Sequence, residues 1–593
     1  MLKAFIPSTK KLHLHLKSKN TFRMNYKRCF SSFLVCLLSI SSLIAQNSYD
    51  QANFRSPLDI PLVLAGTFGE LRSNHFHSGI DIKTKGREGF PVFAIEDGYV
   101  SRMKTSAAGY GKALYITHKN GFVSVYAHLQ NYNDSLAKRF LEEQYNKQKF
   151  ELDFFPEINQ FKVSKGDTIA FTGNSGSSTA PHLHFEIRDA LSQEIINPLL
   201  FGFKAKDTTP PFIKNIHIYP LDKESSINNS ADTLRIPVRQ ISERKYQIDS
   251  TDIRLKGLIG FGVEVFDRLD NAPNKNGVYS IELYIDSSLI YKHRMERFAF
   301  AETRYINSLM DFHAKNNYSM RPQKSFVDPN NKLGVYEHLI NKGKLFFNDK
   351  AEYNGLYIIK DAEGNKSTLE FNFTSDSLLK SPEKKVAIHP FYCKEENSFK
   401  NEDVEVYVSN KSLYHDIDFQ YQKKQADDSF ISDIHCIHNK GTAIHQYYTL
   451  SIVIDSIENR LQDKALICSL GDRGGIHCLA SKWDDGKLTA KARIFGNFSA
   501  IIDTVAPNLK VKQFSRDLSN SKLMSFEVSD TLSGLSSCNA YVDGEWILLE
   551  YDAKKGRLIH YFDGKIKPGQ HQLEIIVQDS VKNEKRLKLE FVR

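Results

Sequence analysis

Short apolar runs separated by turn signals recur along most of the chain. Residues 91–95, 113–116 and 123–126 are such runs, and turns containing Gly, Asp or Asn lie between them. Short β-patterned runs at this spacing predict an antiparallel β domain over residues 47–206. Residues 134–150 break the pattern with apolar side chains at helical spacing among many charges, which predicts a helix inserted beside the β core.

The β pattern continues beyond this first domain. A boundary near residues 207–211 is followed by alternating strands and a closing Asp/Asn turn, and a similar unit follows the boundary at 503–507. This weak repeat predicts β-sandwich modules over residues 207–380, with a polar, partly helical insertion, and over 503–593. Both resemble bacterial immunoglobulin-like modules. Residues 381–502 are expected to be β-rich without further subdivision, so the predicted fold class is mainly β.

The N-terminus has a different pattern. Residues 1–28 contain eight Lys and Arg and no acid, and an apolar, Ser-containing run follows over residues 30–45. That run is shorter than the roughly 18 residues that a membrane span needs. We therefore expect a cleaved secretory signal over residues 1–45, with an uncleaved anchor as the alternative. Translation starting at Met24 would give the signal more usual proportions. The predicted location is the periplasm, the cell envelope or the medium, with no further membrane span.

Charge and cysteine content narrow the function classes. The formal net charge is +9, and the signal region carries eight positive charges, which leaves about +1 for the rest. This near balance removes the electrostatic support for a nucleic-acid-binding protein. Five cysteines follow the signal, none in a C-x-x-C pair, which argues against a cysteine zinc site.

Candidate metal ligands occur in three short segments. His77 and Asp81 are four residues apart and so share a face of an extended segment, and Gly79 between them permits close backbone approach. His182 and His184 share a face of one predicted strand. Two imidazoles, one carboxylate and an open fourth position suit a catalytic zinc ion. The spacing leaves the histidine ligands open among His75, His77, His128, His182 and His184. Arg72 either orients a substrate carboxylate or is a surface charge.

A resemblance narrows this choice. Residues 77–81 read H-x-G-x-D, residues 126–129 read Y-x-H-L, and residues 182–184 read H-x-H. In this order they resemble the lysostaphin/LytM-type family of zinc peptidoglycan endopeptidases, over about residues 60–200. The predicted helix after His128 departs from the shortest members of that family and puts the shape of the groove in doubt.

The resemblance implies a role for each candidate residue. His77, Asp81 and His184 would bind one Zn²⁺ per chain, and His128 and His182 would flank the metal as catalytic residues. One of these two would accept the proton of the attacking water and the other would stabilise the oxyanion.

The expected function is that of an exported zinc metalloendopeptidase. It would hydrolyse peptide bonds in peptidoglycan stem peptides or cross-links with metal-activated water. The expected partners are peptidoglycan and, through the C-terminal modules, other cell-envelope proteins. The alternatives are a catalytically silent activator of other wall hydrolases, and an adhesion or scaffold protein that carries the domain as a passenger. A fragment of residues 47–206 is expected to fold and cleave by itself.

Overall fold

The computed structural model describes residues 49, 52–249, 252–270, 272–380 and 387–593. The predicted signal over residues 1–45 lies outside them. The predicted fold class is confirmed, because β-strands dominate and helices are few. In the part of the chain that the structure describes, no helix has both the length and the apolar character needed to cross a membrane.

One twelve-stranded antiparallel sheet forms the N-terminal domain (residues 53–206), and its main path runs β1-β2-β10-β6-β5-β4-β7. Eleven strands come from this domain and the twelfth comes from residues 297–298. The strands are β1 (Leu64–Gly66), β2 (Ile80–Lys83), β3 (Pro91–Phe93), β4 (Gly98–Thr105), β5 (Lys112–His118), β6 (Phe122–Tyr132), β7 (Leu152–Phe154), β8 (Lys162–Val163), β9 (Thr168–Thr172), β10 (His182–Asp189), β11 (Ile195–Ile196) and β19 (Arg297–Phe298).

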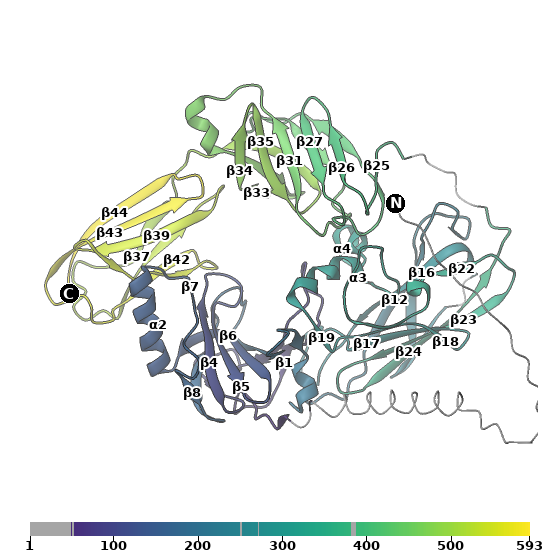
Figure 1. The fold of residues 1–593 in the computed structure, drawn as a ribbon, viewed down its shortest axis with the longest axis horizontal. Coiled ribbons are helices and arrows are strands. Elements are labelled where there is room, and N and C mark those ends of the chain that lie inside the picture. The colour runs from purple at the N-terminus through teal and green to yellow at the C-terminus, as the bar shows by residue number, and fades with distance from the viewer. Residues whose placement is uncertain (1–48, 50–51, 250–251, 271, 381–386) are drawn as a thin grey trace, which may run out of the picture. The chain divides into compact units, whose positions relative to one another are not determined.

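The expected helix is present as α2 (Asp134–Lys147), between β6 and β7. Asn133 caps its start by accepting a hydrogen bond from the Leu136 amide at 3.1 Å. Leu136 and Phe140 are buried, and the Phe140 ring packs edge-on against Tyr132 at 5.3 Å between centroids. The apolar stripe of α2 therefore anchors it beside β6 (Figure 1).

The first module (residues 207–380) contains a second twelve-stranded sheet around one apolar core. Its strands are β12 (Phe212–Pro220), β13 (Ser226–Ile227), β14 (Leu234–Ser242), β15 (Lys245–Ile248), β16 (Arg254–Phe266), β17 (Ser280–Ile285), β18 (Ser288–Arg294), β20 (Gln323–Lys324), β21 (Tyr336–Leu339), β22 (Leu345–Phe347), β23 (Glu352–Lys360) and β24 (Lys366–Ser375). The predicted insertion carries the helices η3 (Phe300–Tyr305), α3 (Ile306–Leu309), α4 (Phe312–Tyr318) and η4 (Asn341–Gly343).

The insertion of the first module packs into the N-terminal domain. Strand β19 pairs with β11, with Ile195 opposite Phe298. Phe68, Phe76 and Ile195 share a buried cluster with Phe298 and with Met310. The N-terminal domain therefore completes its core with residues more than 90 positions further along the chain.

The middle module (residues 387–502) has two five-stranded sheets that enclose one core, so the region that the sequence left undivided forms one unit. One sheet contains β26 (Asn397–Lys400), β27 (Val404–Val408), β31 (Tyr448–Val453), β34 (Ser481–Asp484) and β35 (Lys487–Ala492). The other contains β29 (Tyr421–Lys424), β30 (Ile434–Ile437), β32 (Ala465–Leu470), β33 (Ile476–Leu479) and β36 (Gly496–Ile502). The pair β25 (Pro390–Phe391) and β28 (Ile417–Asp418) and the helix η5 (Asn459–Lys464) complete it. A disulfide joins Cys468 to Cys478.

The C-terminal module (residues 503–593) has two four-stranded sheets around its own core. They contain β37 (Asn508–Gln513), β38 (Leu523–Ser529), β41 (Glu550–Asp552) and β42 (Arg557–Tyr561), and β39 (Leu535–Val542), β40 (Glu545–Ile547), β43 (Gln570–Asp579) and β44 (Glu584–Val592).

Candidate metal centre

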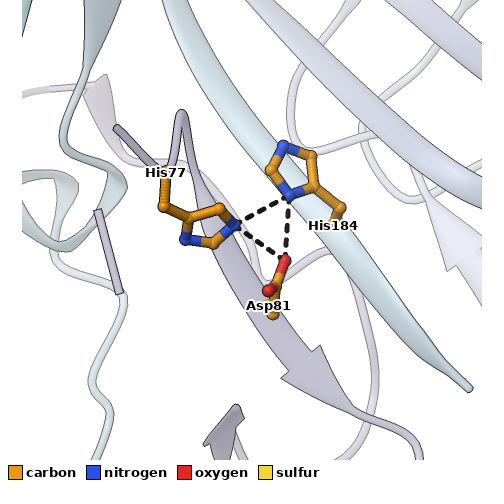
Figure 2. Close-up of side chains that lie close together, drawn as sticks. All are labelled: His77, Asp81 and His184. Carbon is orange, nitrogen blue, oxygen red and sulfur yellow. Dashed lines mark hydrogen bonds and ion pairs between the residues drawn. The ribbon is translucent and has the colours of Figure 1, made fainter. Parts of the chain in front are cut away.

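Three side chains from two paired strands and the loop before them converge on one point of the N-terminal domain. His77 Nε2 lies 3.0 Å from Asp81 Oδ1 and 3.1 Å from His184 Nδ1, and the latter two atoms are 2.9 Å apart. All three residues are buried. Figure 2 shows the two rings and the carboxylate pointing toward one another. One nitrogen from each imidazole and one carboxylate oxygen therefore face a common centre.

Backbone register brings these residues together. Strand β2 pairs antiparallel with β10, and Asp81 is the direct cross-strand partner of His184. Directly opposite residues project to the same face of a sheet. Gly79 precedes β2 at a point where an added Cβ would lie 2.3 Å from the Phe185 carbonyl oxygen. Only glycine fits there, so the close backbone approach predicted from the sequence is present.

The hydrogen bond at the far nitrogen of His77 fixes its tautomer. His77 Nδ1 lies 2.8 Å from the carbonyl oxygen of Thr67, which can only accept, so Nδ1 carries the proton. In the neutral ring Nε2 is then a free lone pair that faces Asp81 and His184. Such a partner on the second nitrogen is typical of metal-binding histidines.

His184 is oriented in the same manner by a carboxylate. Its Nε2 donates to Glu186 Oε1 at 2.9 Å, which leaves Nδ1 as the lone pair at the centre. Glu186 is fully buried, accepts from Ser78 Oγ at 2.6 Å and from the Tyr110 hydroxyl, and is paired with Arg188 through two nitrogens. Burial opposes ionisation, but Arg188 and these donors lower the pKa of Glu186, so it stays an anion.

The second oxygen of Asp81 also has a fixed partner. Arg72 Nη2 lies 3.2 Å from Asp81 Oδ2 and 3.2 Å from Glu70 Oε2. Arg72 is thus neither a free surface charge nor directed at the centre; it holds the carboxylate so that only Oδ1 faces the histidines.

The three converging atoms fit a cation. With Nδ1 of His77 and Nε2 of His184 protonated, the atoms that face one another are two lone pairs and a carboxylate oxygen, which repel without a positive charge between them. Without a metal ion, a proton on His184 supplies part of this positive charge. Burial lowers the pKa of His184, but hydrogen bonds to Asp81 and Glu186 outweigh burial and raise this pKa to about 9. Two imidazoles and one carboxylate form a ligand set typical of zinc.

The two remaining histidines lie beside the centre. The His128 ring is 4.8 Å from that of His182 and 5.8 Å from that of His184, measured between centroids. His128 is on β6 with a positive φ of 57°, and its Nδ1 donates to the Ser175 carbonyl at 2.9 Å. Burial, followed by the neighbouring His184 and His182, lowers the pKa of His128 to about 3. His128 is therefore a neutral base at physiological pH.

His182 is more exposed than His128 and is held from one side. Its Nδ1 lies 2.8 Å from the Ala180 carbonyl and 3.1 Å from Ser178 Oγ, so Nε2 faces the centre, 3.4 Å from Asp81 Oδ1. His75, by contrast, is exposed and bonded to the Ser73 carbonyl, away from the centre.

Sequence reasoning missed the residues that orient the ligands. Glu186 had a signal, because it continues the period-2 face of His182 and His184 on β10. The Thr67 carbonyl, ten residues before His77, and Tyr110, 76 residues before Glu186, were not identified as partners of the centre.

Comparisons with known proteins agree with this site. Residues 75–140 match Peptidase family M23, and residues 388–503 match the Zu5-like domain. The chain is 30% identical over 139 residues to DD-carboxypeptidase/endopeptidase Mpg of Neisseria meningitidis serogroup B, covering 23% of this chain and 26% of that protein. It is 32% identical over 135 residues to murein hydrolase activator NlpD of Escherichia coli K12, covering 23% and 28%. The match thus spans about a quarter of each of these two relatives.

Two further matches lie in the same domain. The chain is 31% identical over 116 residues to lipoprotein NlpD of Yersinia enterocolitica, covering 20% of this chain and 93% of that protein. The catalytic domain of lysostaphin from Staphylococcus simulans is 24% identical over 24% of this chain and 91% of that chain, with a TM-score of 0.18. The family model and the sequence relatives define a domain of the M23 peptidase type. The chain belongs to peptidase family M23, of the LytM type, as the resemblance predicted.

Proposed function

We propose that the chain is an exported zinc metalloendopeptidase that hydrolyses peptide bonds in peptidoglycan stem peptides or cross-links. The observation that carries this proposal is the convergence of His77 Nε2, Asp81 Oδ1 and His184 Nδ1 beside two further imidazoles. The relatives named as an endopeptidase and as a murein hydrolase activator support peptidoglycan as the substrate class.

His77, Asp81 and His184 would hold one Zn²⁺ per chain. When bound, such an ion polarises a carbonyl group and acidifies water. The chain's own contribution is to fix the three ligand atoms: Thr67 and Glu186 set the histidine tautomers, and fixed outer partners of this kind raise metal affinity.

His128 and His182 would move the protons. His128 Nδ1 donates to the Ser175 carbonyl, so Nε2 is the free nitrogen that would accept a proton from the attacking water and return it to the leaving amine. His182 Nε2 is the nitrogen that faces the centre, and in a ring protonated at both nitrogens it would donate a hydrogen bond to the oxyanion. His182 and His128 thus take complementary roles beside the centre.

A cavity of about 680 Å³ is lined by Leu129, which follows His128, and by Ser175, whose carbonyl accepts from His128, and it would bind the substrate peptide. Leu129 and Ser175 line it from the N-terminal domain, and Glu550 and Lys555 from the C-terminal module. Both signs of charge along its wall suit stem peptides, which carry free carboxylates and amines. We propose that the C-terminal module completes this groove.

The predicted signal supports export to the cell envelope, where peptidoglycan lies. The other faces of the three β modules would bind envelope proteins.

A second candidate is an activator of other wall hydrolases. It is favoured by the hydrogen bonds of Lys554, from the C-terminal module, to the Asn174 and Ser178 carbonyls in the loop that holds His128. Purified peptidoglycan incubated with the zinc-loaded chain separates the two functions. An endopeptidase releases fragments whose masses show hydrolysed peptide bonds. An activator releases none by itself but accelerates an added amidase.

A further inference from the structure

A second group of convergent oxygen ligands lies where the N-terminal domain meets the first module. Asp207 begins the first module, Asp267 follows β16 and Asp361 follows β23, and one oxygen from each lies within 4.8 Å of the others. Two oxygens on one Ca²⁺, each 2.3–2.6 Å from it, are at most about 5 Å apart. The three carboxylates therefore have a spacing that a single cation can bridge.

Asp267 marks this group as more than a cluster of surface acids. Its side chain is 2% exposed, and no donor among the described residues reaches its Oδ1. Asn276, its direct partner in a β-bridge, is 3% exposed, and both polar atoms of its side-chain amide are also without a partner there. Directly opposed residues have side chains on the same face. A buried carboxylate and a buried amide left unpaired side by side each carry a desolvation cost that a bound cation would offset.

Space for one ion is present at the same point. Asp207, Asp267 and Asp361 line a cavity of about 20 Å³, together with Thr67 and Gly277 from the two sides of the junction. That volume holds about one water-sized particle. Mg²⁺ usually retains several waters, whereas Ca²⁺ accepts an all-protein set of carboxylate and amide oxygens, so the cavity favours Ca²⁺.

Electrostatics point the same way. Burial, then repulsion from Asp207 and Asp361, raises the pKa of Asp267 to about 8, and burial raises the pKa of Asp207 to about 7. A cation among these groups would remove that repulsion.

The C-terminal module carries an internal comparison. Asp503, Asp530 and Asp579 occupy corresponding positions and also converge. There, however, Asp530 Oδ2 accepts from the amides of Leu532 and Gly534 at 3.2 and 2.7 Å. The Asp530 carboxylate thus has backbone donors, whereas Asp267 Oδ1 in the first module has none among the described residues.

We propose that Asp207, Asp267, Asp361 and the Asn276 amide bind one structural Ca²⁺, which ties the start of the first module to the ends of β16 and β23. This site is separate from the zinc centre and does not depend on the proposed catalytic activity. In the exported protein it would act as a stability clamp, because an ion that binds only the folded chain stabilises it.

The test uses the full chain, loaded with zinc, in calcium-free buffer. The chain is melted in a calorimeter at increasing CaCl₂ concentrations. The Tm of the transition in which the first module unfolds should rise by roughly 5–10 °C once the Ca²⁺ concentration exceeds its Kd about 100-fold. Asp267→Asn should abolish this response. The matched control Asp530→Asn should keep the calcium response.

Equilibrium dialysis against radioactive Ca²⁺ gives the direct count and does not depend on melting. The wild type should bind one ion more than Asp267→Asn. If Asp267→Asn fails to fold, Asp207→Asn, at a half-exposed position, takes its place in the comparison. The calcium site would be ruled out if the wild type and the variant bound equal numbers of ions, or if about 10 mM CaCl₂ left the wild-type Tm unchanged. An equal shift with MgCl₂ would overturn its assignment to calcium.

Discussion

The ring of Phe298 packs against that of Phe76 at 5.4 Å between centroids, although Phe76 directly precedes the metal-site residue His77 and Phe298 belongs to the insertion of the first module. Phe298 also contacts the Phe68 ring at 4.9 Å. Both neighbours flank the turn whose Thr67 carbonyl orients His77. The insertion therefore packs against the segment that carries Thr67 and His77 and so supports the metal centre.

Phe298→Ala should lower the free energy of unfolding by about 3–5 kcal/mol, since it empties a fully buried aromatic site. Chemical denaturation of the full chain measures this. Phe346→Ala, at a 67% exposed position of the same module, is the matched control and should change stability by less than about 0.5 kcal/mol. Equal stability of the two variants would show that the shared core contributes little.

A fragment of residues 47–206 should aggregate or lose zinc. The sequence suggested that it would fold alone, but the cut removes β19 and exposes Phe68, Phe76 and Ile195. Comparing its solubility and zinc content with those of a fragment of residues 47–380 tests this. A soluble, zinc-loaded 47–206 fragment would contradict the structure-based expectation.

Glu186→Gln should weaken zinc binding about 10- to 100-fold, because the anion that fixes the His184 tautomer is lost. Competition with a chromogenic chelator measures the affinity, and circular dichroism checks that the fold survives loss of the Arg188 pair. Glu157→Gln, at an exposed position of the same domain, should leave the affinity unchanged. An unaltered zinc affinity in Glu186→Gln would remove Glu186 from the site.

His128→Ala and His182→Ala should keep zinc and lose most turnover. Neither ring belongs to the converging set, so His77, Asp81 and His184 remain to bind the ion. Loss of a proton-transfer group costs about 10²–10⁴-fold, and loss of an oxyanion donor about 10²–10³-fold. His184→Ala, in contrast, should lose both zinc and activity. Zinc loss in His128→Ala or His182→Ala equal to that in His184→Ala would refute the division into ligands and catalysts.

Lys554→Ala should raise KM for soluble wall fragments a few-fold with little change in kcat. The Lys554 ammonium holds the loop of Asn174 and Ser178 at the groove, and a charge-assisted hydrogen bond contributes about 1.5 kcal/mol or more. Lys588→Ala, on the same module with a side chain 76% exposed, is the control. An unchanged KM would indicate that the C-terminal module does not shape the groove, whereas a higher kcat would favour an inhibitory contact.

The sequence predicted the centre better than its surroundings, for physical reasons. His77 and Asp81 are near neighbours, and His182 and His184 share a strand, so local periodicity and the family motif identified the residues that converge. The helix at α2 was also predictable, because its apolar spacing and its Asn133 cap are local. Partners such as Tyr110 and Phe298 meet the site only through contacts between residues far apart in the chain. The orientation of each ligand therefore became visible only in three dimensions.

Activity as a function of bound zinc tests the central claim most directly. The full chain is stripped of metal, reloaded with known amounts of Zn²⁺, and assayed by the new amino groups released from purified peptidoglycan, with His184→Ala treated in parallel. The account predicts that release is absent without zinc, rises in proportion to bound zinc and levels off at one ion per chain, with none from His184→Ala. Release from the metal-free chain, or none from the chain that holds one zinc, would contradict it.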